Sequence, residues 1–394
     1  MQRNNLAISL LFGAIILVAA GVFWPALTGP FLLDDFLHLP KLAENTAVDS
    51  LQALYQFVLT GAAVAGRPLS FLSILVNDNT WPTDPWGFKY TNLLIHLLNG
   101  VLVFIFVRML SQTLEDRSST SYSNRSNLTA LLVMAIWLLH PMQLSAMMLV
   151  IQRMTLLMAM FTLLGMIFYL KGRLLAPHSP LGSYIRMCVG VGLFGLLGVL
   201  SKETAVMIVF YVLALEVTLI AHISLPRPTY WKYWFAFFIL APMAAIALYF
   251  LANIPYMDDL YLKRDFNMVE RLLTETRVLT SYLSYIVMPS LSGTGPYHDD
   301  FLISRGLLEP PTTLLAIAAI VAALIFATLN RLRHPLLAFA IFWFFLAHIL
   351  ESTILPLELY FEHRNYLPML GIFFSVSYWA IHSRRKITSV ARTG

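Results

Sequence analysis

Residues 6–24 read LAISLLFGAIILVAAGVFW, and this first apolar run predicts the fold class of the whole chain. A transmembrane helix needs about 20 consecutive apolar residues, because each residue adds about 1.5 Å to a helix that must cross about 30 Å of hydrocarbon. Runs of similar length recur as far as residue 382. No small-residue cleavage site follows the first run, so we expect an uncleaved helix rather than a signal peptide.

The composition agrees with a membrane protein. Of the 394 residues, 58% are hydrophobic and 12% are charged, and the mean hydropathy is +0.72. Soluble domains carry about 25% charged residues. The single cysteine, Cys188, excludes an intramolecular disulfide and a cysteine metal cluster. The basic residues are dispersed between apolar runs rather than gathered in a stripe, so the chain is not expected to bind nucleic acid.

The sequence therefore predicts an all-α polytopic membrane protein in which residues 1–394 form a single domain of about ten transmembrane helices. The predicted spans are 6–24, 88–108, 128–147, 154–171, 186–201, 204–222, 232–252, 312–330, 335–350 and 366–382.

Charge asymmetry orients these spans. With both termini in the cytoplasm, the short inner loops hold most of the Lys and Arg residues, as the positive-inside rule requires. Most carboxylates then fall outside, in a large outer loop at 25–87, for which we expect short interfacial helices, and in a second outer segment at 253–311. Residues 268–289 are amphipathic and predict an interfacial or re-entrant helix; if they instead crossed the membrane, every later loop would change sides.

Four outer stretches carry the polar residues that are candidates for a site. Charged side chains at the hydrocarbon edge are costly, and by default they face protein or a water-filled cavity. Snorkelling to the headgroups and structural ion pairing are the alternatives for each of them. The stretches are FLLDDFLHLP at 31–40 with GRPLSF at 66–71, HPMQLSAMMLVIQR at 140–153, SKET at 201–204, and HILESTILPLELYFEHRNYLP at 348–368.

The adjacent carboxylates Asp34 and Asp35 are the leading chemical candidates. A carboxylate can act as general base toward a hydroxyl, and two side by side suit base chemistry or a divalent metal. The structural alternative is that one aspartate caps the short helix that follows. Arg and Lys elsewhere on the outer face would hold a phosphate and stabilise its charge as it leaves.

Five stretches in order resemble one enzyme family. They are GRPLSFLSILVNDN…GFKYTNLLIHLLNG at 66–100, LLHPMQLSAMMLVIQRMTLLMAMFTLLG at 138–165, LSKETAVM at 200–207, LLTETRVLTSYLSYIVMP at 272–289 and LELYFEHRNYLPMLG at 357–371. With the acidic loop FLLDDFLHL, they resemble the GT-C superfamily of polyprenyl-phosphate-sugar-dependent glycosyltransferases. Within it the likeness is to the membrane domain of the transmembrane-and-tetratricopeptide-repeat protein O-mannosyltransferases and to bacterial type IV pilin glycosyltransferases.

This resemblance implies a GT-C-like fold and a site with named roles. Asp34 would be the catalytic base, and Asp35 would support it or bind a metal. The residues implied to line the site and bind the donor phosphate and substrate are Arg67, His96, His140, Arg153, Lys202, Glu203, Glu362, His363 and Arg364. Among them, Arg153, Lys202 and Arg364 are expected to contact the phosphate because of their charge. A divalent metal is the one cofactor left open, with Asp35, Asp299 and Asp300 as its candidate ligands.

The implied reaction moves a sugar from a polyprenyl-phosphate carrier to a hydroxyl of an exported protein, a pilin for example, with inversion at the periplasmic face of a bacterial inner (plasma) membrane. The partners are then the lipid-linked sugar, the acceptor protein and membrane lipid. No tetratricopeptide repeats are found in the chain, so we expect the outer loops or another protein to recognise the acceptor. The chain also contains no Gly-rich phosphate loop, so a nucleotide-sugar donor is disfavoured.

Three alternatives stay open at this point. A glycosyltransferase of the same class could modify a lipid or a glycan. A transporter or flippase of lipid-linked sugar would also have many spans, but it more typically shows paired halves and broken helices near the bilayer centre. A scaffold without chemistry would not need its polar motifs on one side. We favour the enzyme.

Overall fold

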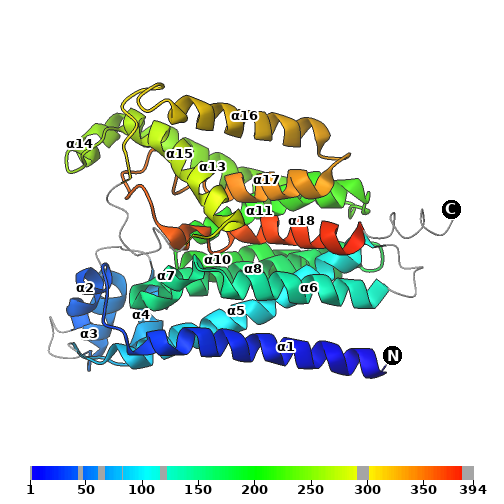
Figure 1. Cartoon of the computed structure of the whole chain (residues 1–394), viewed down its shortest axis with the longest axis horizontal. Helices are drawn as coiled ribbons and strands as arrows, with labels where there is room; N and C mark the ends of the chain where they lie inside the picture. The colour runs from blue at the N-terminus through cyan, green and yellow to red at the C-terminus, as the bar shows by residue number, and fades with distance from the viewer. Residues whose placement is uncertain are drawn as a thin grey trace. The chain divides into compact units, whose positions relative to one another are not determined.

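The computed structural model describes residues 2–42, 48–60, 67–81, 83–115, 122–290 and 301–383, and every regular element within these ranges is a helix (Figure 1). The expectation of an all-α protein is therefore confirmed. The chain divides into two compact units. Unit 1 comprises residues 1–173, 181–206 and 376–394, and unit 2 comprises residues 174–180 and 207–375.

Unit 1 contains the helices of the first half of the chain. They are α1 (Gln2–Phe23), α2 (Asp35–His38), α3 (Leu51–Tyr55), α4 (Pro68–Leu75), α5 (Pro85–Leu114), α6 (Tyr122–Leu139), α7 (Gln143–Met148), α8 (Arg153–Leu175), α9 (Pro180–Cys188) and α10 (Gly195–Val199). A π-helical segment, η5 (Val189–Phe194), joins α9 to α10. The last helix, α18 (Pro368–His382), begins in unit 2 and ends in unit 1.

Unit 2 contains α11 (Ile208–Leu215), α12 (Trp231–Phe235), α13 (Ala241–Asn253), α14 (Met257–Tyr261), α15 (Met268–Val287), α16 (Thr312–Asn330) and α17 (Pro335–Ala347). The π-helical segment η7 (Glu216–Ile220) extends α11, and another, η8 (Ala236–Leu240), joins α12 to α13.

Seven continuous helical segments are long and apolar enough to cross a membrane. They are Leu6–Thr28, Pro85–Leu114, Val150–Leu175, Pro180–Val199, Glu203–Ile220, Trp231–Tyr256 and Thr312–Asn330. The helices Asn124–Leu139 and Pro335–Ala347 are apolar but shorter. In lipid every backbone polar group must be satisfied internally, which helices achieve. The chain is therefore a polytopic helical membrane protein.

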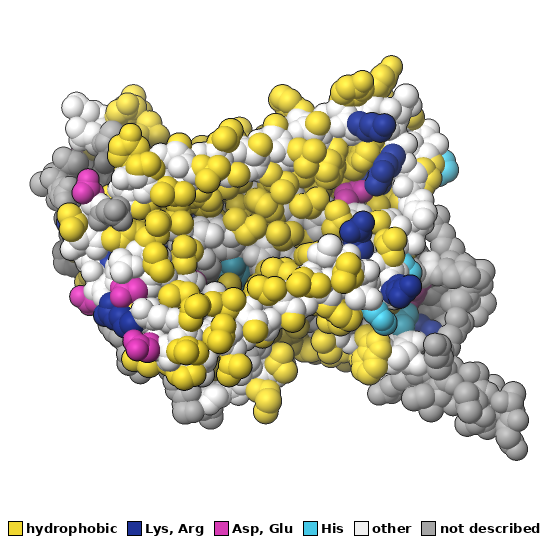
Figure 2. Space-filling view, turned by 90° about the horizontal axis from the view of Figure 1, so that it is seen from above, with side chains coloured by type: hydrophobic (Ala, Val, Ile, Leu, Met, Phe, Trp, Pro, Cys, Tyr) yellow, Lys and Arg dark blue, Asp and Glu magenta, His cyan; other side chains and the backbone are white. Residues whose placement is uncertain are grey.

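Several of these segments expose apolar side chains along their length. None of the residues of α13 is buried, and only 17% of the apolar window in α16 is buried. Figure 2 shows apolar side chains over most of the visible face, with charged side chains towards the ends of the helices. Such a surface is stable against hydrocarbon rather than water.

Residues 268–289, which the sequence predicts to be interfacial or re-entrant, form α15. This helix is not among the seven apolar segments, and Asn267 and Glu270 close its N-terminus with a capping box. Its buried side includes Arg271, Glu275 and Tyr282. The short helices expected in the 25–87 loop are present as α2, α3 and α4.

In unit 1, α1 packs against both α5 and α6, which pack along each other (Figure 1). At the end of this group, His382 of α18 is paired with Glu115, which also accepts a hydrogen bond from Ser126 at 3.1 Å. In unit 2, α11 packs against α17, with the Tyr211 and Trp343 rings 4.2 Å apart.

One glycine sets the spacing between α8 and the α9–α10 segment. A Cβ atom at Gly190 would lie 2.6 Å from the Gly165 carbonyl oxygen and 2.8 Å from the Tyr169 nitrogen, both of them backbone atoms. The Gly190→Ala variant must push two helices apart, so we expect a loss of about 1–3 kcal/mol and a lower thermal unfolding midpoint in detergent. Gly13→Ala is the control, because no atom lies within 4 Å of its Cβ. Equal midpoints for the two variants would contradict this packing.

Candidate functional site

The acidic loop of unit 1 begins at a strained residue. Leu33 has a φ of 45°, a left-handed conformation that a branched side chain rarely adopts. Such strain persists only where surrounding contacts impose it, and it is frequent at functional sites. The next two residues are Asp34 and Asp35, so the strained turn fixes the direction in which their side chains leave the backbone.

Asp35 is fully buried and ties the loop to the start of α8. Its Oδ1 accepts a hydrogen bond from the Ile151 N–H at 2.8 Å, and its Oδ2 accepts one from the Leu32 N–H at 3.1 Å. Burial raises the pKa of Asp35 from 3.8 to about 6, although the Ile151 and Leu32 hydrogen bonds and the charge of Lys89 lower it in part. Asp35 therefore links the loop after α1 to the segment just before α8.

Asp34 differs from its neighbour in every respect that matters for chemistry. Its side chain is partly exposed, and although it occupies the N-cap position of α2, it makes no capping hydrogen bond. Within the described ranges no hydrogen bond or ion pair engages its carboxylate. The helix-cap alternative is thus unsupported for Asp34, and its carboxylate is available to a ligand.

Lys89, in the first turns of α5, supports the same loop and was not among the residues expected from the sequence. Its Nζ donates to the carbonyl oxygens of Gly29 at 2.9 Å and Pro30 at 2.7 Å, and the side chain is fully buried. A lysine within an otherwise apolar span is the signal that could have identified it, because such a charge is costly without partners.

Arg153 is buried and fully engaged by protein. Its Nε donates to Asn92 Oδ1 at 2.8 Å, and its two terminal nitrogens donate to the carbonyls of Ser73 at 2.5 Å and Phe88 at 2.9 Å. The guanidinium therefore holds α4 and α5 to the start of α8. This arrangement gives Arg153 a structural task instead of leaving it open to a phosphate.

The SKET stretch joins the same group of loops. Arg67 makes a two-bond ion pair with Glu203, whose side chain is 53% exposed, and the Arg67 Nε to Glu203 Oε2 distance is 2.7 Å. The Nζ of Lys202, which is buried, lies 3.3 Å from the Thr155 hydroxyl. Beside them the Ser70 hydroxyl donates to the Ser201 carbonyl at 2.8 Å. Three of the four polar stretches are thus connected by specific contacts.

Two of the three histidines expected in the site, His96 and His140, are core residues of unit 1. His96 is fully buried, its Nε2 lies 3.1 Å from the Leu138 carbonyl, and its ring stacks on Trp137. His140 is buried, and its Nδ1 accepts a hydrogen bond from the Met142 N–H at 3.3 Å. Both of them position the turn between α6 and α7.

The fourth polar stretch belongs to unit 2 and forms its own charged group. Arg364 is buried, donates to the Leu359 and Glu358 carbonyls at 3.1 and 2.6 Å, and lies 3.9 Å from Glu275. Glu275 is paired more closely with Arg271, at 3.0 Å. Burial raises the pKa of Glu275, which both arginines lower in part.

Glu362 and His363 begin the short helix η10 (Glu362–Asn365) beside Arg364, and both are buried. The His363 ring stacks on Phe361 with ring centroids 5.0 Å apart. Phe361 in turn is held by Tyr282, whose hydroxyl accepts from its N–H at 2.8 Å and donates to its carbonyl at 3.0 Å.

The described residues give no support for the expected metal site. Asp299 and Asp300 lie outside the described residues. Within the described ranges, no group of three or more His, Cys, Asp or Glu side chains is arranged to hold a metal ion.

No protein-family model, curated protein or solved structure matches the chain.

The raised pKa of Asp35 predicts how stability depends on pH. Its folded-state pKa of about 6 exceeds the ordinary 3.8, so protonated Asp35 adds at most about 3 kcal/mol to the free energy of unfolding. This contribution is complete below pH 3.8 and is lost as the pH rises through 6. Asp35→Asn cannot titrate, so the difference in unfolding midpoint between wild type and this variant should change between pH 4 and 7. A constant difference across that window would contradict a buried Asp35.

Replacing Arg153 distinguishes a structural role from phosphate binding. Arg153→Met leaves three buried acceptors without their donor, and we expect a loss of about 3 kcal/mol or more. The measurement is the unfolding midpoint and membrane yield, with the exposed Arg186→Met variant of α9 as the control. A normally folded Arg153→Met protein with weakened donor binding would assign the guanidinium to the phosphate instead.

Proposed function

We propose that the protein is a membrane glycosyltransferase that moves a sugar from a polyprenyl-phosphate carrier to a hydroxyl of an exported protein. The observation that carries the proposal is that the two adjacent aspartates differ in hydrogen bonding and exposure. Asp35 accepts two backbone hydrogen bonds. Asp34, held next to it after the strained Leu33, has a partly exposed carboxylate with no partner among the described residues. A general base needs that combination of fixed position and free lone pairs.

In the proposed reaction, Asp34 accepts the proton of the acceptor hydroxyl. The hydroxyl oxygen attacks the anomeric carbon, and the bond from that carbon to the phosphate oxygen breaks. The electron pair leaves with the polyprenyl phosphate, so attack from the opposite face inverts the anomeric configuration. No nucleophile on the protein and no nucleotide is required.

The donor phosphate needs a cation, and Lys202 is our assignment within unit 1. Its Nζ donates a hydrogen bond to the hydroxyl of Thr155, in the first turn of α8. Thr155 lies two residues after Arg153, whose guanidinium is bonded to protein. Fixed cations of this kind stabilise charge on a leaving phosphate most strongly where water is excluded.

The membrane arrangement is part of the same proposal. Ten spans would result if α6, α17 and α18 cross the bilayer together with the seven longer segments. Both termini would then be cytoplasmic, and the Asp34 loop would face the periplasm of a bacterial inner membrane. A lipid donor suits this position, because its chain stays in the bilayer while its phosphate reaches the boundary at which Asp34 stands.

The experiment that tests the proposal uses a deletion strain complemented with wild type, Asp34→Asn or the control Asp259→Asn, which alters an exposed carboxylate on α14. Intact masses of exported proteins and the pool of polyprenyl-phosphate sugars are recorded in each strain. Loss of a general base reduces the rate about 10²–10⁴-fold, so Asp34→Asn should remove a sugar mass from a protein while the lipid-linked sugar persists or accumulates. If both pools match wild type at normal membrane levels of the variant, Asp34 is not the base.

A further inference from the structure

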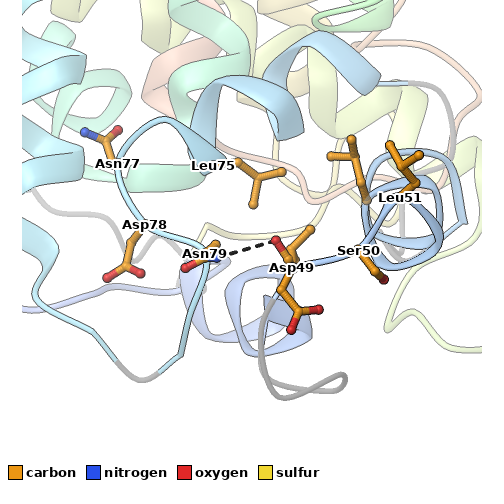
Figure 3. A pocket seen from close by; sticks show the side chains of 9 residues that line it. Asp49, Ser50, Leu51, Leu75, Asn77, Asp78 and Asn79 are labelled. Atoms are coloured by element: carbon orange, nitrogen blue, oxygen red, sulfur yellow. Dashed lines mark hydrogen bonds between the residues drawn. The ribbon is translucent and has the colours of Figure 1, made fainter.

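A second feature of unit 1 lies in the same outer loop, away from the Asp34 carboxylate. It is a cleft with a cavity volume of about 570 Å³, formed between residues 48–54 and 75–79 (Figure 3). Its polar lining consists of Asp49, Ser50, Asn77, Asp78 and Asn79. Pockets that bind small ligands or peptide side chains have volumes of about 300–1,000 Å³, so this cleft is large enough to be a binding site.

The cleft is built by hydrogen bonds between its two walls. The Val48 N–H donates to the Asn79 carbonyl at 3.2 Å, and the Asn79 side-chain amide donates back to the Val48 carbonyl at 3.4 Å. On the other wall, the Asn77 amide donates to the Gly87 carbonyl at 3.1 Å and to the Thr91 hydroxyl at 2.8 Å. The walls are thus fixed to each other and to α5 before any ligand arrives.

Its floor is continuous with the core that supports the aspartate loop. Leu54 and Leu75 line the cleft, and they also pack against a buried apolar cluster that contains Phe31 and Ile151. Phe31 precedes the aspartate pair, and the Ile151 N–H is the donor to Asp35. A ligand in the cleft would therefore press on the same cluster that positions Asp34.

The charges of the lining indicate what kind of ligand fits. Asp49 is exposed, and Figure 3 shows its carboxylate extending to the same side as that of Asp78. A hydrogen bond from Thr83, with others from Thr80, lowers the pKa of Asp78, so the Asp78 carboxylate is ionised near neutral pH. Among the described residues that line the cleft none is Lys, Arg or His. Such a lining repels phosphate and attracts cations and hydroxyl groups.

We propose that this cleft binds the acceptor polypeptide, through a basic segment that also carries hydroxyl side chains. The carboxylates pair with its Lys or Arg residues, the Asn79 and Ser50 side chains hydrogen-bond its hydroxyls and backbone, and the leucines contact its aliphatic carbons. The identification of this polypeptide as the acceptor rests on the proposed function, whereas the binding of such a segment does not.

A polypeptide fits this cleft better than a glycan. The cleft has two negative charges that a neutral sugar would leave unpaired, and none of its described lining residues has an aromatic ring on which the apolar face of a sugar could stack. A basic peptide satisfies the carboxylates directly.

The test measures binding to the full chain in lipid nanodiscs. The probes are a short synthetic peptide of Ser, Thr and Lys, the same peptide with Glu in place of Lys, and a neutral oligosaccharide. The variants are Asp49→Asn and the control Asp259→Asn, each with its unfolding midpoint recorded. Because Asp49 is exposed, its replacement should leave the midpoint unchanged.

We expect the Lys peptide alone to bind, with an affinity that falls as salt is added. Asp49→Asn should weaken binding by up to about fivefold, as for an exposed ion pair, and Asp259→Asn should not. Equal affinity for wild type and Asp49→Asn, absence of Lys-peptide binding, or displacement of the peptide by the oligosaccharide would each overturn the proposal.

The same assay with Asp34→Asn separates this proposal from the proposed function. The peptide should bind this variant as it binds wild type, because Asp34 is not part of the cleft lining. If the peptide binds in the predicted way while Asp34→Asn leaves exported proteins fully modified in cells, the cleft stands and the transferase mechanism fails. If sugar transfer depends on Asp34 but no peptide binds, the transferase mechanism stands and the proposal for the cleft fails.

Discussion

The two hydrogen bonds accepted by the Asp35 carboxylate are the constraint on which the candidate site depends. The bond from the Ile151 N–H joins residues that are 116 positions apart, the loop after α1 and the start of α8, and the bond from the Leu32 N–H fixes the loop locally. A second polar attachment between the chain preceding α5 and the start of α8 is the hydrogen bond from Arg153 to the Ser73 carbonyl. The strained Leu33 and the direction of the Asp34 side chain both follow from the attachment of Asp35, because each lies within two residues of Asp35.

Buried charges in both units are stabilised mainly by backbone carbonyls. Lys89 holds the carbonyls of Gly29 and Pro30, and Arg153 holds those of Ser73 and Phe88. In unit 2, Arg271 donates to the carbonyls of Thr353 and Glu351 at 3.0 and 2.8 Å. An unpaired buried charge would cost several kcal/mol. Lys89 and Arg271 therefore fix non-helical segments, and Arg153 fixes α4 and α5 to the start of α8.

A cation that is used in this way differs from one that binds substrate, and the sequence alone does not distinguish the two. Arg153 lies at the end of an apolar helix, where its charge favours a phosphate contact, yet all three of its guanidinium nitrogens are bonded to protein. The difference arises from acceptors 61 to 80 residues away. Local patterns carry no information about such partners.

Helices were predictable because their signals are local. Apolar runs identified the seven long segments, and Asn267 with Glu270 marks the start of α15 by a spacing that the capping box requires. The sequence also shows that the two aspartates are adjacent, but it does not show their roles. Those roles differ because the Ile151 N–H, 116 positions away in the sequence, donates a hydrogen bond to Asp35 and not to Asp34. The role of Lys89 and the cleft between residues 48–54 and 75–79 depend on long-range contacts in the same way.

Chemical rescue of the proposed base is the most direct test of this account. Purified Asp34→Ala protein in vesicles would be supplied with lipid-linked sugars extracted from its host and with the exported protein that loses its sugar in cells. Release of free polyprenyl phosphate would be followed as formate is added. The account predicts no turnover without formate, turnover that rises with formate concentration, and no formate effect on an Asp35→Ala protein. Wild-type turnover by Asp34→Ala without formate would contradict it.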